Sequence, residues 1–352
     1  MAWHNIEGHD AVVEKLRLAV ARNRLASSFL FAGPAGIGKR TFALRFAQAL
    51  LCQKNPEAAL DPCNTCASCA MALAGTHPDI EVISKPPDKA FLPVELFLGD
   101  SQHRGREGLC HWIGLKPFLG GRRIAIIDDA DLFNDAGANC LLKTLEEPPP
   151  RSVLILIGTS PARQLPTIRS RCQLIRFQPL DEPTVARLLL ANKLVKEPAE
   201  AARLARYGEG SVQQAVELAD ADLWTCRREL LEHLSAAVPD SVGLAPKIAA
   251  FVDDAGKEAS ARRARLRQVV NFAAEFYRRM VYARSNLPLA VDAEMRGPLE
   301  TAVERFPGDA VTAAACLERC LDALAQIDRN ANQATLIEAW LDDLAAECLA
   351  AR

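Results

Sequence analysis

A glycine-rich loop between a short apolar strand and a helix is the feature that most constrains this fold. The apolar residues 28–32 run into the sequence Gly-Pro-Ala-Gly-Ile-Gly-Lys, and a helix-favouring stretch follows over 42–51. Gly33, Gly38 and Lys39 match the G-x-x-x-x-G-K part of the phosphate-binding loop, where backbone amides and the lysine hold anionic oxygens at a helix start. The succession of strand, loop and helix predicts an α/β domain built around a phosphate site.

The residue after the loop lysine departs from this motif. A serine or threonine hydroxyl is needed there to bind Mg²⁺, but the chain has Arg40, a cation that cannot coordinate a metal. Thr41 supplies a hydroxyl one residue later, yet a helix turns about 100° per residue, so this hydroxyl points away from the magnesium site. We therefore expect ATP hydrolysis to be lost, while binding of ATP or ADP stays open.

A second strand ends in acidic residues. The apolar residues 124–127 precede Asp128 and Asp129, which suits a metal-water ligand followed by an acid that orients water. The alternative is that both carboxylates cap the following turn, where Asp131 and Asp135 also lie. An aspartate at the second position is one methylene shorter than a glutamate, which again indicates a weakened hydrolytic centre.

Strand-like and helical segments alternate through the first half of the chain. An amphipathic helix is predicted over 10–25, with Asp10 as its N-cap, and a loop over 85–105. Alternation of this kind predicts a parallel sheet covered by helices on both faces. Besides 28–32, the predicted strands are 80–83, 123–127, 153–158 and 173–177.

Helical patterns alone follow Pro179. Short helices are expected first, and from about residue 222 alanine, leucine and arginine recur at helical spacing, with breaks near Pro239, Pro288 and Pro307. The predicted domains are an α/β nucleotide-binding domain, a small helical lid and an all-helical bundle, at 1–179, 180–221 and 222–352.

Four of the 11 cysteines lie in one compact segment. Cys63, Cys66 and Cys69 follow a C-x-x-C-x-x-C pattern, and Cys52 lies upstream near the end of a predicted helix. Four thiolates suit a tetrahedral structural Zn²⁺ ion. Iron–sulfur ligation also uses C-x-x-C-x-x-C, but its usual fourth cysteine three residues later is missing. The remaining cysteines lie among apolar residues, as expected of reduced core thiols.

Bulk composition limits the function classes. The formal net charge is only -2, so the chain is not expected to bind nucleic acid by itself. The basic stretch from Lys257 to Arg267 favours a solvated helix face over a DNA contact, and no histidine pair or nucleophile motif supports hydrolase chemistry. With no apolar run of about 18 residues and no secretory signal at the start, we expect a cytoplasmic protein without a membrane partner.

Two longer segments resemble a known family. The stretches Leu141-Leu-Lys-Thr-Leu-Glu-Glu-Pro-Pro149 and Leu165-Pro-Thr-Ile-Arg-Ser-Arg-Cys-Gln173 are similar to signatures of bacterial clamp-loader subunits of the AAA+ class, the delta-prime subunits of DNA polymerase III. The resemblance covers roughly residues 4–220. It implies an AAA+ phosphate-loop fold with a helical lid and a C-terminal collar, and a structural zinc ion at the four cysteines.

The resemblance also implies roles for single residues. Thr159 and Ser160 occupy the sensor position, and Arg171 occupies the position of the arginine finger. Gln213 stands where the motor subunits carry an arginine that senses the γ-phosphate. The residues expected at the nucleotide site, from motif and resemblance together, are Gly33, Gly36, Gly38, Lys39, Arg40, Thr41, Asp128, Asp129 and Thr159.

The leading hypothesis is therefore a non-motor clamp-loader subunit. The resemblance implies motor (gamma/tau) and delta subunits, the sliding clamp and, within the complex, primer-template DNA as partners. The chain would be part of a DNA-directed DNA polymerase (nucleotidyltransferase) holoenzyme without its own ATPase activity. The alternatives are an active motor-type ATPase and a zinc-dependent DNA-binding module with a vestigial ATPase fold.

Overall fold

The computed structural model describes the chain except for residues 1–2, 4–5, 87–88, 90, 289–290 and 352. The described residues form two compact units, Met1–Ala219 and Asp220–Arg352. Pro87, which falls in the segment predicted as a loop, lies outside the described residues. Each unit is described by itself below.

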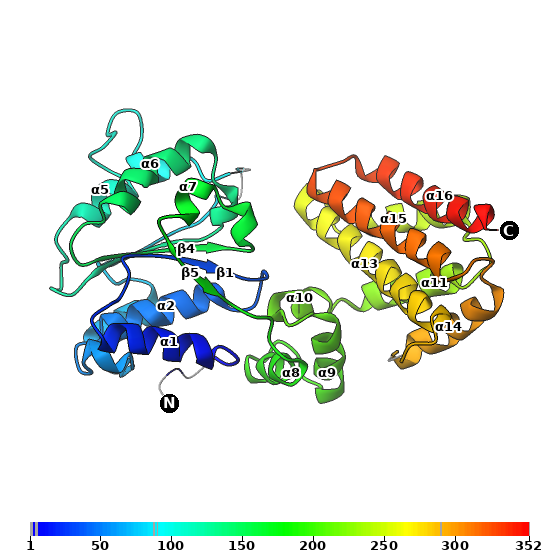
Figure 1. Cartoon of the computed structure of the whole chain (residues 1–352), viewed down its shortest axis with the longest axis horizontal. Coiled ribbons are helices and arrows are strands. Elements are labelled where there is room, and N and C mark those ends of the chain that lie inside the picture. Colours follow the sequence, from blue (N-terminus) through cyan, green and yellow to red (C-terminus); the bar gives the residue numbers. More distant parts are fainter. Residues whose placement is uncertain (1–2, 4–5, 87–88, 90, 289–290, 352) are drawn as a thin grey trace. The chain divides into compact units, whose positions relative to one another are not determined.

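A five-stranded parallel sheet forms the centre of the first unit (Figure 1). The strand order is β2-β3-β4-β1-β5, and every residue of β1, β3 and β4 is buried. Burial on both faces explains why these strands are continuous apolar runs without alternation. The predicted α/β class with a parallel sheet is confirmed. The strands are β1 Ser28–Ala32, β2 Ile80–Ile83, β3 Arg123–Ile127, β4 Ser152–Gly158 and β5 Gln173–Arg176.

Helices cover both faces of this sheet. Helices α1 and α2 lie on one face and α5, α6 and α7 on the other (Figure 1), and each face has its own apolar core. Short 3-10 turns occur at Glu57–Ala59, Ala130–Leu132 and Pro161–Arg163. The α-helices of this unit are α1 Asp10–Ala21, α2 Lys39–Leu50, α3 Ala67–Ala74, α4 Glu95–Leu98, α5 Leu109–Gly114, α6 Asp135–Glu146, α7 Pro166–Arg169, α8 Glu182–Ala191, α9 Pro198–Tyr207 and α10 Val212–Glu217.

Two predictions about this unit need correction. The first helix is shorter than the predicted span 10–25: its N-cap is His9 instead of Asp10, and it ends at Ala21, just before Asn23 adopts a left-handed backbone with φ 52°. The segment 85–105 is not entirely loop, because it contains the short helix α4.

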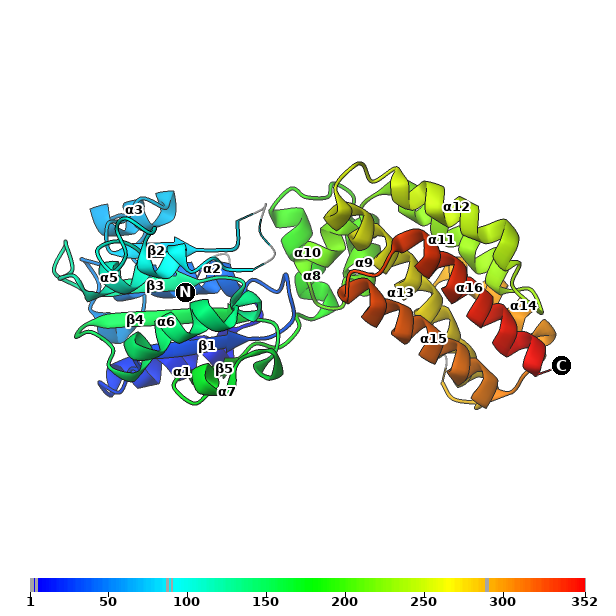
Figure 2. The same ribbon diagram turned by 90° about the horizontal axis from the view of Figure 1, so that it is seen from above.

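The second unit is a bundle of helices. Helix α13 packs along α15, and α16 packs against α12 and α15 (Figure 2). The predicted helix breaks near Pro239, Pro288 and Pro307 are confirmed, since all three prolines lie between helices. The helices are α11 Ala221–Leu234, α12 Ser241–Asp253, α13 Ala259–Arg284, α14 Ala293–Arg305, α15 Ala310–Asp328 and α16 Gln333–Ala350.

Arginines on the bundle helices pair with acidic residues. Arg262 and Arg267 form ion pairs with Asp253 and Asp328. Arg265 pairs with Asp220 at 2.8 Å and lies over the ring of Phe251, 4.7 Å from its centroid. The expectation of a merely solvated face is therefore wrong for Arg265, which joins α13 to α12.

Arg227 of α11 is a buried charge at the base of α14. Its side chain is 0% exposed and donates hydrogen bonds to Asp292 at 2.8 Å and to Glu294 at 2.7 Å. Asp292 is also the N-cap of α14 and accepts from the backbone of Glu294 and Met295. One guanidinium thus ties the start of α14 to α11.

We predict that Arg227→Ala destabilises this corner of the bundle by about 3 kcal/mol, because it removes a fully buried guanidinium and takes this partner from Asp292, whose side chain is only 18% exposed. Amide hydrogen exchange in α11 and α14 of the full chain should accelerate roughly 100-fold. The matched control is Arg278→Ala, which removes a 45% exposed side chain from a surface ion pair and should change stability by less than about 1 kcal/mol. Equal protection of the α11 and α14 amides from hydrogen exchange in Arg227→Ala and Arg278→Ala would contradict the prediction.

Candidate functional site

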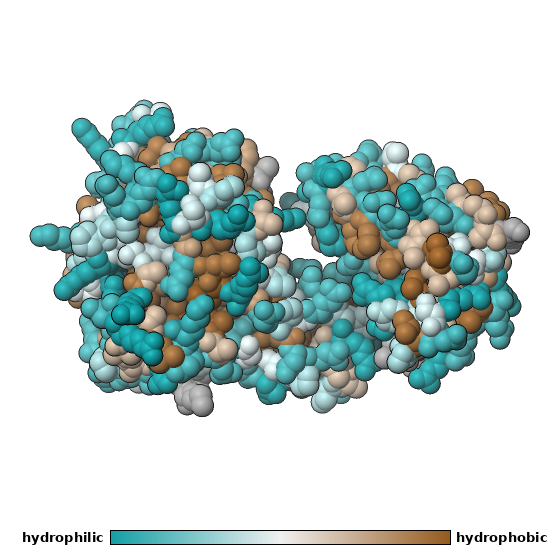
Figure 3. Space-filling model, viewed as in Figure 1, coloured by the Kyte–Doolittle hydropathy of each residue, from teal (hydrophilic) through white to brown (hydrophobic). Residues whose placement is uncertain are grey.

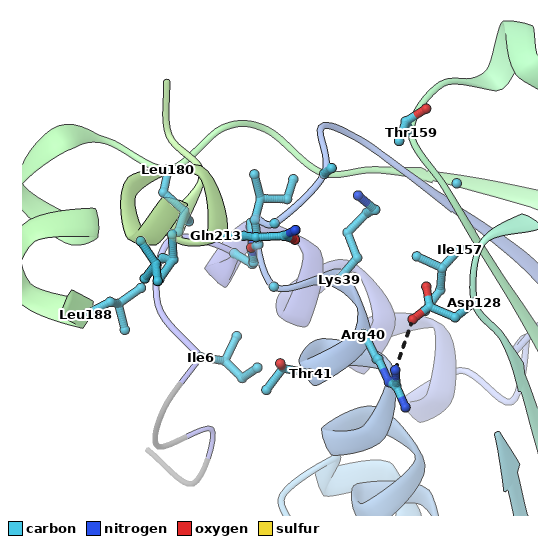
Figure 4. A pocket seen from close by; sticks show the side chains of 18 of the residues that line it. Ile6, Lys39, Arg40, Thr41, Asp128, Ile157, Thr159, Leu180, Leu188 and Gln213 are labelled. Carbon is cyan, nitrogen blue, oxygen red and sulfur yellow. Dashed lines mark hydrogen bonds and ion pairs between the residues drawn. The ribbon is translucent and has the colours of Figure 1, made fainter. Parts of the chain in front are cut away.

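A large cavity of the first unit lies at the carboxyl ends of the parallel strands, where helices α8 and α10 approach the glycine loop (Figure 4). Its volume is about 930 Å³. Strand ends, the loop after β1 and the start of α2 all contribute to its wall. Carboxyl ends of parallel strands and helix N-termini are the usual place for anionic ligands in α/β folds.

The glycines of the loop are required by its geometry. Gly36 and Gly38 have φ values of 72° and 94°, a left-handed conformation that side chains disfavour. A Cβ atom at Gly36 would lie 2.2 Å from the hydroxyl of Ser211, and one at Gly33 would lie 2.4 Å from the carbonyl of Phe177. The backbone N–H of Val212 donates to the carbonyl of Gly36 at 3.2 Å. The start of α10 therefore rests directly on the loop.

Lys39 is turned back onto its own loop. Its ammonium group donates to the carbonyl oxygens of Gly33 at 2.6 Å and Pro34 at 2.5 Å. The side chain is almost fully buried, and this burial lowers the pKa of Lys39, while Asp128 and Asp131 oppose the shift. A phosphate group would have to compete with two backbone carbonyls for this lysine.

Arg40, at the motif position that normally supplies the magnesium ligand, forms an ion pair. Nη1 of Arg40 lies 3.5 Å from the carboxylate of Asp128, and Figure 4 shows the two side chains facing each other. Burial, together with Asp129, raises the pKa of Asp128, while Arg40 and Lys39 hold it down. Thr41 points to another side of the helix start (Figure 4). No hydroxyl from position 40 or 41 therefore faces Asp128.

Asp129 and Thr159 both form hydrogen bonds with other residues of the chain. Asp129 has φ 55° and accepts a hydrogen bond from the backbone N–H of Lys85 at 3.3 Å, so it helps to form the turn after β3. The backbone N–H and hydroxyl of Thr159 both donate to Asp131, at 2.6 Å and 2.5 Å. Gln164 donates to the other carboxylate oxygen of Asp131.

The Asp131 contact was missed by sequence reasoning. The two partners are 28 residues apart, and only the pairing of β3 with β4 brings the loops that follow these strands together. Gln213 does line the cavity, as its expected sensor position implies, and its side-chain amide donates to Glu217 at 3.0 Å.

Arg171 lies outside the cavity wall of its own chain. It follows α7, and its guanidinium donates to Glu146 at 2.6 Å and to the carbonyl of Thr167 at 2.9 Å. The side chain is 33% exposed. Glu146, the last residue of α6, was not predicted as a site residue, because its position in the Leu-Glu-Glu-Pro segment does not reveal which side chain it contacts.

The four predicted metal-binding cysteines come together. The sulfur atoms of Cys52, Cys63, Cys66 and Cys69 all lie within 4.8 Å of one another, and Sγ of Cys63 is 3.9 Å from Sγ of Cys69. A tetrahedral ion with metal–sulfur bonds of about 2.3 Å requires sulfur separations of about 3.8 Å. The donor set and its spacing therefore fit a four-coordinate metal ion.

Backbone N–H groups point at these sulfurs. The N–H of Cys63 lies 3.5 Å from the sulfur of Cys52. The N–H of Cys66 lies 3.3 Å from the sulfur of Cys63, and the N–H of Cys69 lies 3.4 Å from the sulfur of Cys66. Such contacts, led by the N–H of Thr65, lower the pKa of Cys63 to about 5. Burial instead raises the pKa of Cys69. Amides directed at sulfur stabilise thiolates, the form in which cysteine binds metal.

Comparison with known proteins assigns this architecture to a family. Residues 8–181 match the family described as DNA polymerase III, delta subunit. A DNA polymerase III subunit delta' from Pseudomonas aeruginosa is 36% identical over 64% of this chain and 65% of its own length. Residues 8–181 are thus similar to this family of DNA polymerase III subunits. The delta' subunit of Escherichia coli is 31% identical over 64% of each protein.

The chain matches just under two thirds of the length of these delta-prime relatives. A DNA polymerase III subunit tau/gamma from Haemophilus influenzae is 28% identical over 61% of this chain and 30% of its own length. Among solved structures, a DNA polymerase III gamma subunit-related protein from Thermotoga maritima aligns with a TM-score of 0.42 and 16% identity, over 96% of this chain and 99% of the other. None of the helices formed by the described residues has the length and apolar character needed to cross a bilayer.

We predict that Arg40→Ala raises the pKa of Asp128 further above its ordinary value. Burial already favours the protonated acid, and the substitution removes a cation that stabilises the carboxylate. A pH titration followed by carboxyl ¹³C NMR measures the shift. Arg17→Ala, which removes a 53% exposed side chain paired with Glu14 on α1, is the matched control. An unchanged or lowered pKa in the Arg40 variant would refute the electrostatic role of the pair.

Proposed function

We propose that the chain is a non-motor subunit of a clamp loader, which helps to place a sliding clamp on primed DNA. Its relatives named delta' and tau/gamma support a place among the subunits of DNA polymerase III. The observation that carries the non-motor role is the ion pair between Asp128 and Arg40, the residue that replaces the magnesium-binding hydroxyl of the phosphate-loop motif. Motor (gamma/tau) and delta subunits, the clamp and primer-template DNA are the partners of such a subunit.

Several contacts support a silent ATPase centre. Lys39 donates hydrogen bonds to the loop carbonyls, and Thr159 donates a hydrogen bond to Asp131. Gln213 offers no cation to a γ-phosphate. The tau/gamma relatives favour the alternative of an active motor, but hydrolysis in phosphate-loop enzymes depends on the magnesium ligand that Arg40 replaces.

Arg171 is the residue through which this subunit acts on a neighbour. An arginine finger neutralises charge that develops on the transferred phosphoryl group and needs no nucleotide in its own chain. Arg171 lies away from its own cavity, is partly exposed, and is held by Glu146 and the carbonyl of Thr167. Because both partners of this ion pair are partly exposed, the guanidinium can turn from Glu146 to the ATP of an adjacent motor subunit at little cost.

Arg171→Ala is expected to slow ATP hydrolysis at that adjacent site by about 10³-fold or more. The measurement is single-turnover hydrolysis by a reconstituted complex in which only the motor subunit next to this chain can hydrolyse ATP. Arg171→Lys should not restore the rate, because an ammonium group lacks the planar fork of donors. Arg169→Ala, which removes an exposed arginine at the end of the same short helix, is the matched control.

Complex assembly, followed by size-exclusion chromatography, should be the same for both alanine variants. An unchanged hydrolysis rate with Arg171→Ala in an intact complex would exclude the finger role. Robust ATP turnover by the purified chain alone would instead support the motor alternative.

The helical unit is proposed as the collar that joins subunits. Its surface carries apolar side chains among polar ones (Figure 3). The large exposed ones include Val311 at 74% and Leu321 at 50% on α15, and Leu349 at 56% on α16. Exposed apolar side chains of this size are available for contacts between subunits. The division of the first unit into a domain over 1–179 and a lid over 180–221 is part of the same proposal.

The cysteine cluster is proposed to hold a structural Zn²⁺ ion. Four sulfur ligands complete a tetrahedral shell and leave no position for substrate, which argues against metal catalysis there. The cluster is tied to α2, because Gln48 donates to the carbonyl of Cys69 at 3.1 Å and Arg45 donates to Asn64 at 3.3 Å. Loss of the metal would therefore loosen the helix that follows the phosphate loop.

Purified protein should contain one equivalent of zinc, measured by inductively coupled plasma mass spectrometry. Cys69→Ser removes the most buried ligand and should abolish stoichiometric zinc and lower the thermal unfolding midpoint. Cys140→Ser is the control, since Cys140 lies outside the cluster, and it should retain one equivalent. Iron in place of zinc, or no metal, would overturn the assignment.

A further inference from the structure

We propose that the guanidinium of Arg40 takes the place of the divalent cation in the cavity, which thereby binds a nucleoside polyphosphate without Mg²⁺. The proposal goes beyond the clamp-loader role, because that role requires only that the chain does not hydrolyse ATP. The same residue that removes the metal ligand supplies a fixed positive charge of its own.

The position of Arg40 matches the position of the missing ion. It directly follows the loop lysine, lines the cavity and faces Asp128, whose carboxylate ends the strand next to β4. A divalent cation placed there would have to displace the guanidinium or lie beside it. Two positive charges placed this close together repel each other, so the guanidinium disfavours a divalent cation at this position.

Arg40 keeps donors available for phosphate. Its contact with Asp128 is loose, at 3.5 Å through one terminal nitrogen, and its side chain is 54% exposed. A guanidinium has five N–H donors in a planar fork, and this fork matches the spacing of phosphate oxygens. One edge can therefore stay with Asp128 while the remaining donors reach a polyphosphate.

The rest of the cavity is still built for a nucleotide. The glycines keep the left-handed conformations that expose loop amides at the start of α2. Apolar side chains from both ends of the unit line the opposite wall and can cover a base; they include Ile6, Leu180, Leu188 and Val216. The ammonium of Lys39 must leave the carbonyls of Gly33 and Pro34, so we expect weak affinity, in the micromolar to millimolar range.

Isothermal titration calorimetry of the full chain with ATP tests this proposal. Buffers with and without MgCl₂ should be treated with a chelating resin before any MgCl₂ is added, because added EDTA would also compete for metal at the cysteine cluster. The wild-type dissociation constant should change by less than about twofold on adding Mg²⁺. In magnesium-free buffer, Arg40→Ala should weaken binding at least tenfold, and Arg17→Ala on α1 should not.

Arg40→Thr restores the hydroxyl of the motif, and the comparison of its ATP affinity with and without Mg²⁺ is the decisive one. This variant should bind ATP poorly without Mg²⁺ and at least tenfold more tightly with it. Inorganic tripolyphosphate, the second probe, should bind the wild type more weakly than ATP because it cannot use the apolar wall. Circular dichroism checks that each variant is folded.

Four results would overturn the proposal: no binding of ATP in magnesium-free buffer, unchanged ATP affinity of Arg40→Ala in that buffer, a wild-type affinity that depends on Mg²⁺, or tripolyphosphate binding as tightly as ATP. None of them affects the arginine-finger proposal, which depends on a different residue and a different subunit's nucleotide.

Discussion

The position of β1 between β4 and β5 is the constraint on which the first unit depends. Parallel pairing on both sides, with Phe29 opposite Ile155 and Leu30 opposite Leu174, buries the strand completely. The loop after β1 must then emerge at the sheet edge where β3 and β4 also end. This shared edge brings Arg40 to Asp128, although the two residues are far apart in the sequence.

Charges at this edge are balanced within the chain. Arg40 forms an ion pair with Asp128, and Lys39 donates hydrogen bonds to carbonyl oxygens. Asp131 accepts hydrogen bonds from Thr159 and Gln164. A motor subunit would leave such groups for Mg²⁺ and the γ-phosphate. Here most of the groups that could stabilise a phosphoryl-transfer transition state already have partners, so reaching that state would first require breaking contacts within the chain.

The elements with strong local signals could be predicted from the sequence. All five strands, the phosphate loop and the cysteine cluster follow from apolar runs, glycine spacing and C-x-x-C spacing, which act over a few residues. The hydrogen bonds of Thr159 to Asp131 and of Arg171 to Glu146 could not be predicted, because these residues are brought together only by the tertiary packing of neighbouring elements. The end of α1 was misplaced because the apolar spacing continues to Leu25, whereas the backbone turns at Asn23.

The contacts of Arg171 differ in kind from those of Lys39. Lys39 is nearly fully buried beneath its loop, so its release costs two hydrogen bonds to loop carbonyls. Arg171 is one third exposed and pairs with a carboxylate that is itself 49% exposed, an ion pair that water already weakens. Under the arginine-finger proposal, a phosphate of a neighbouring subunit therefore draws Arg171 from Glu146 more easily than a ligand in the cavity draws Lys39 from its loop. This difference in burial favours action on a partner's nucleotide over chemistry in the chain's own cavity.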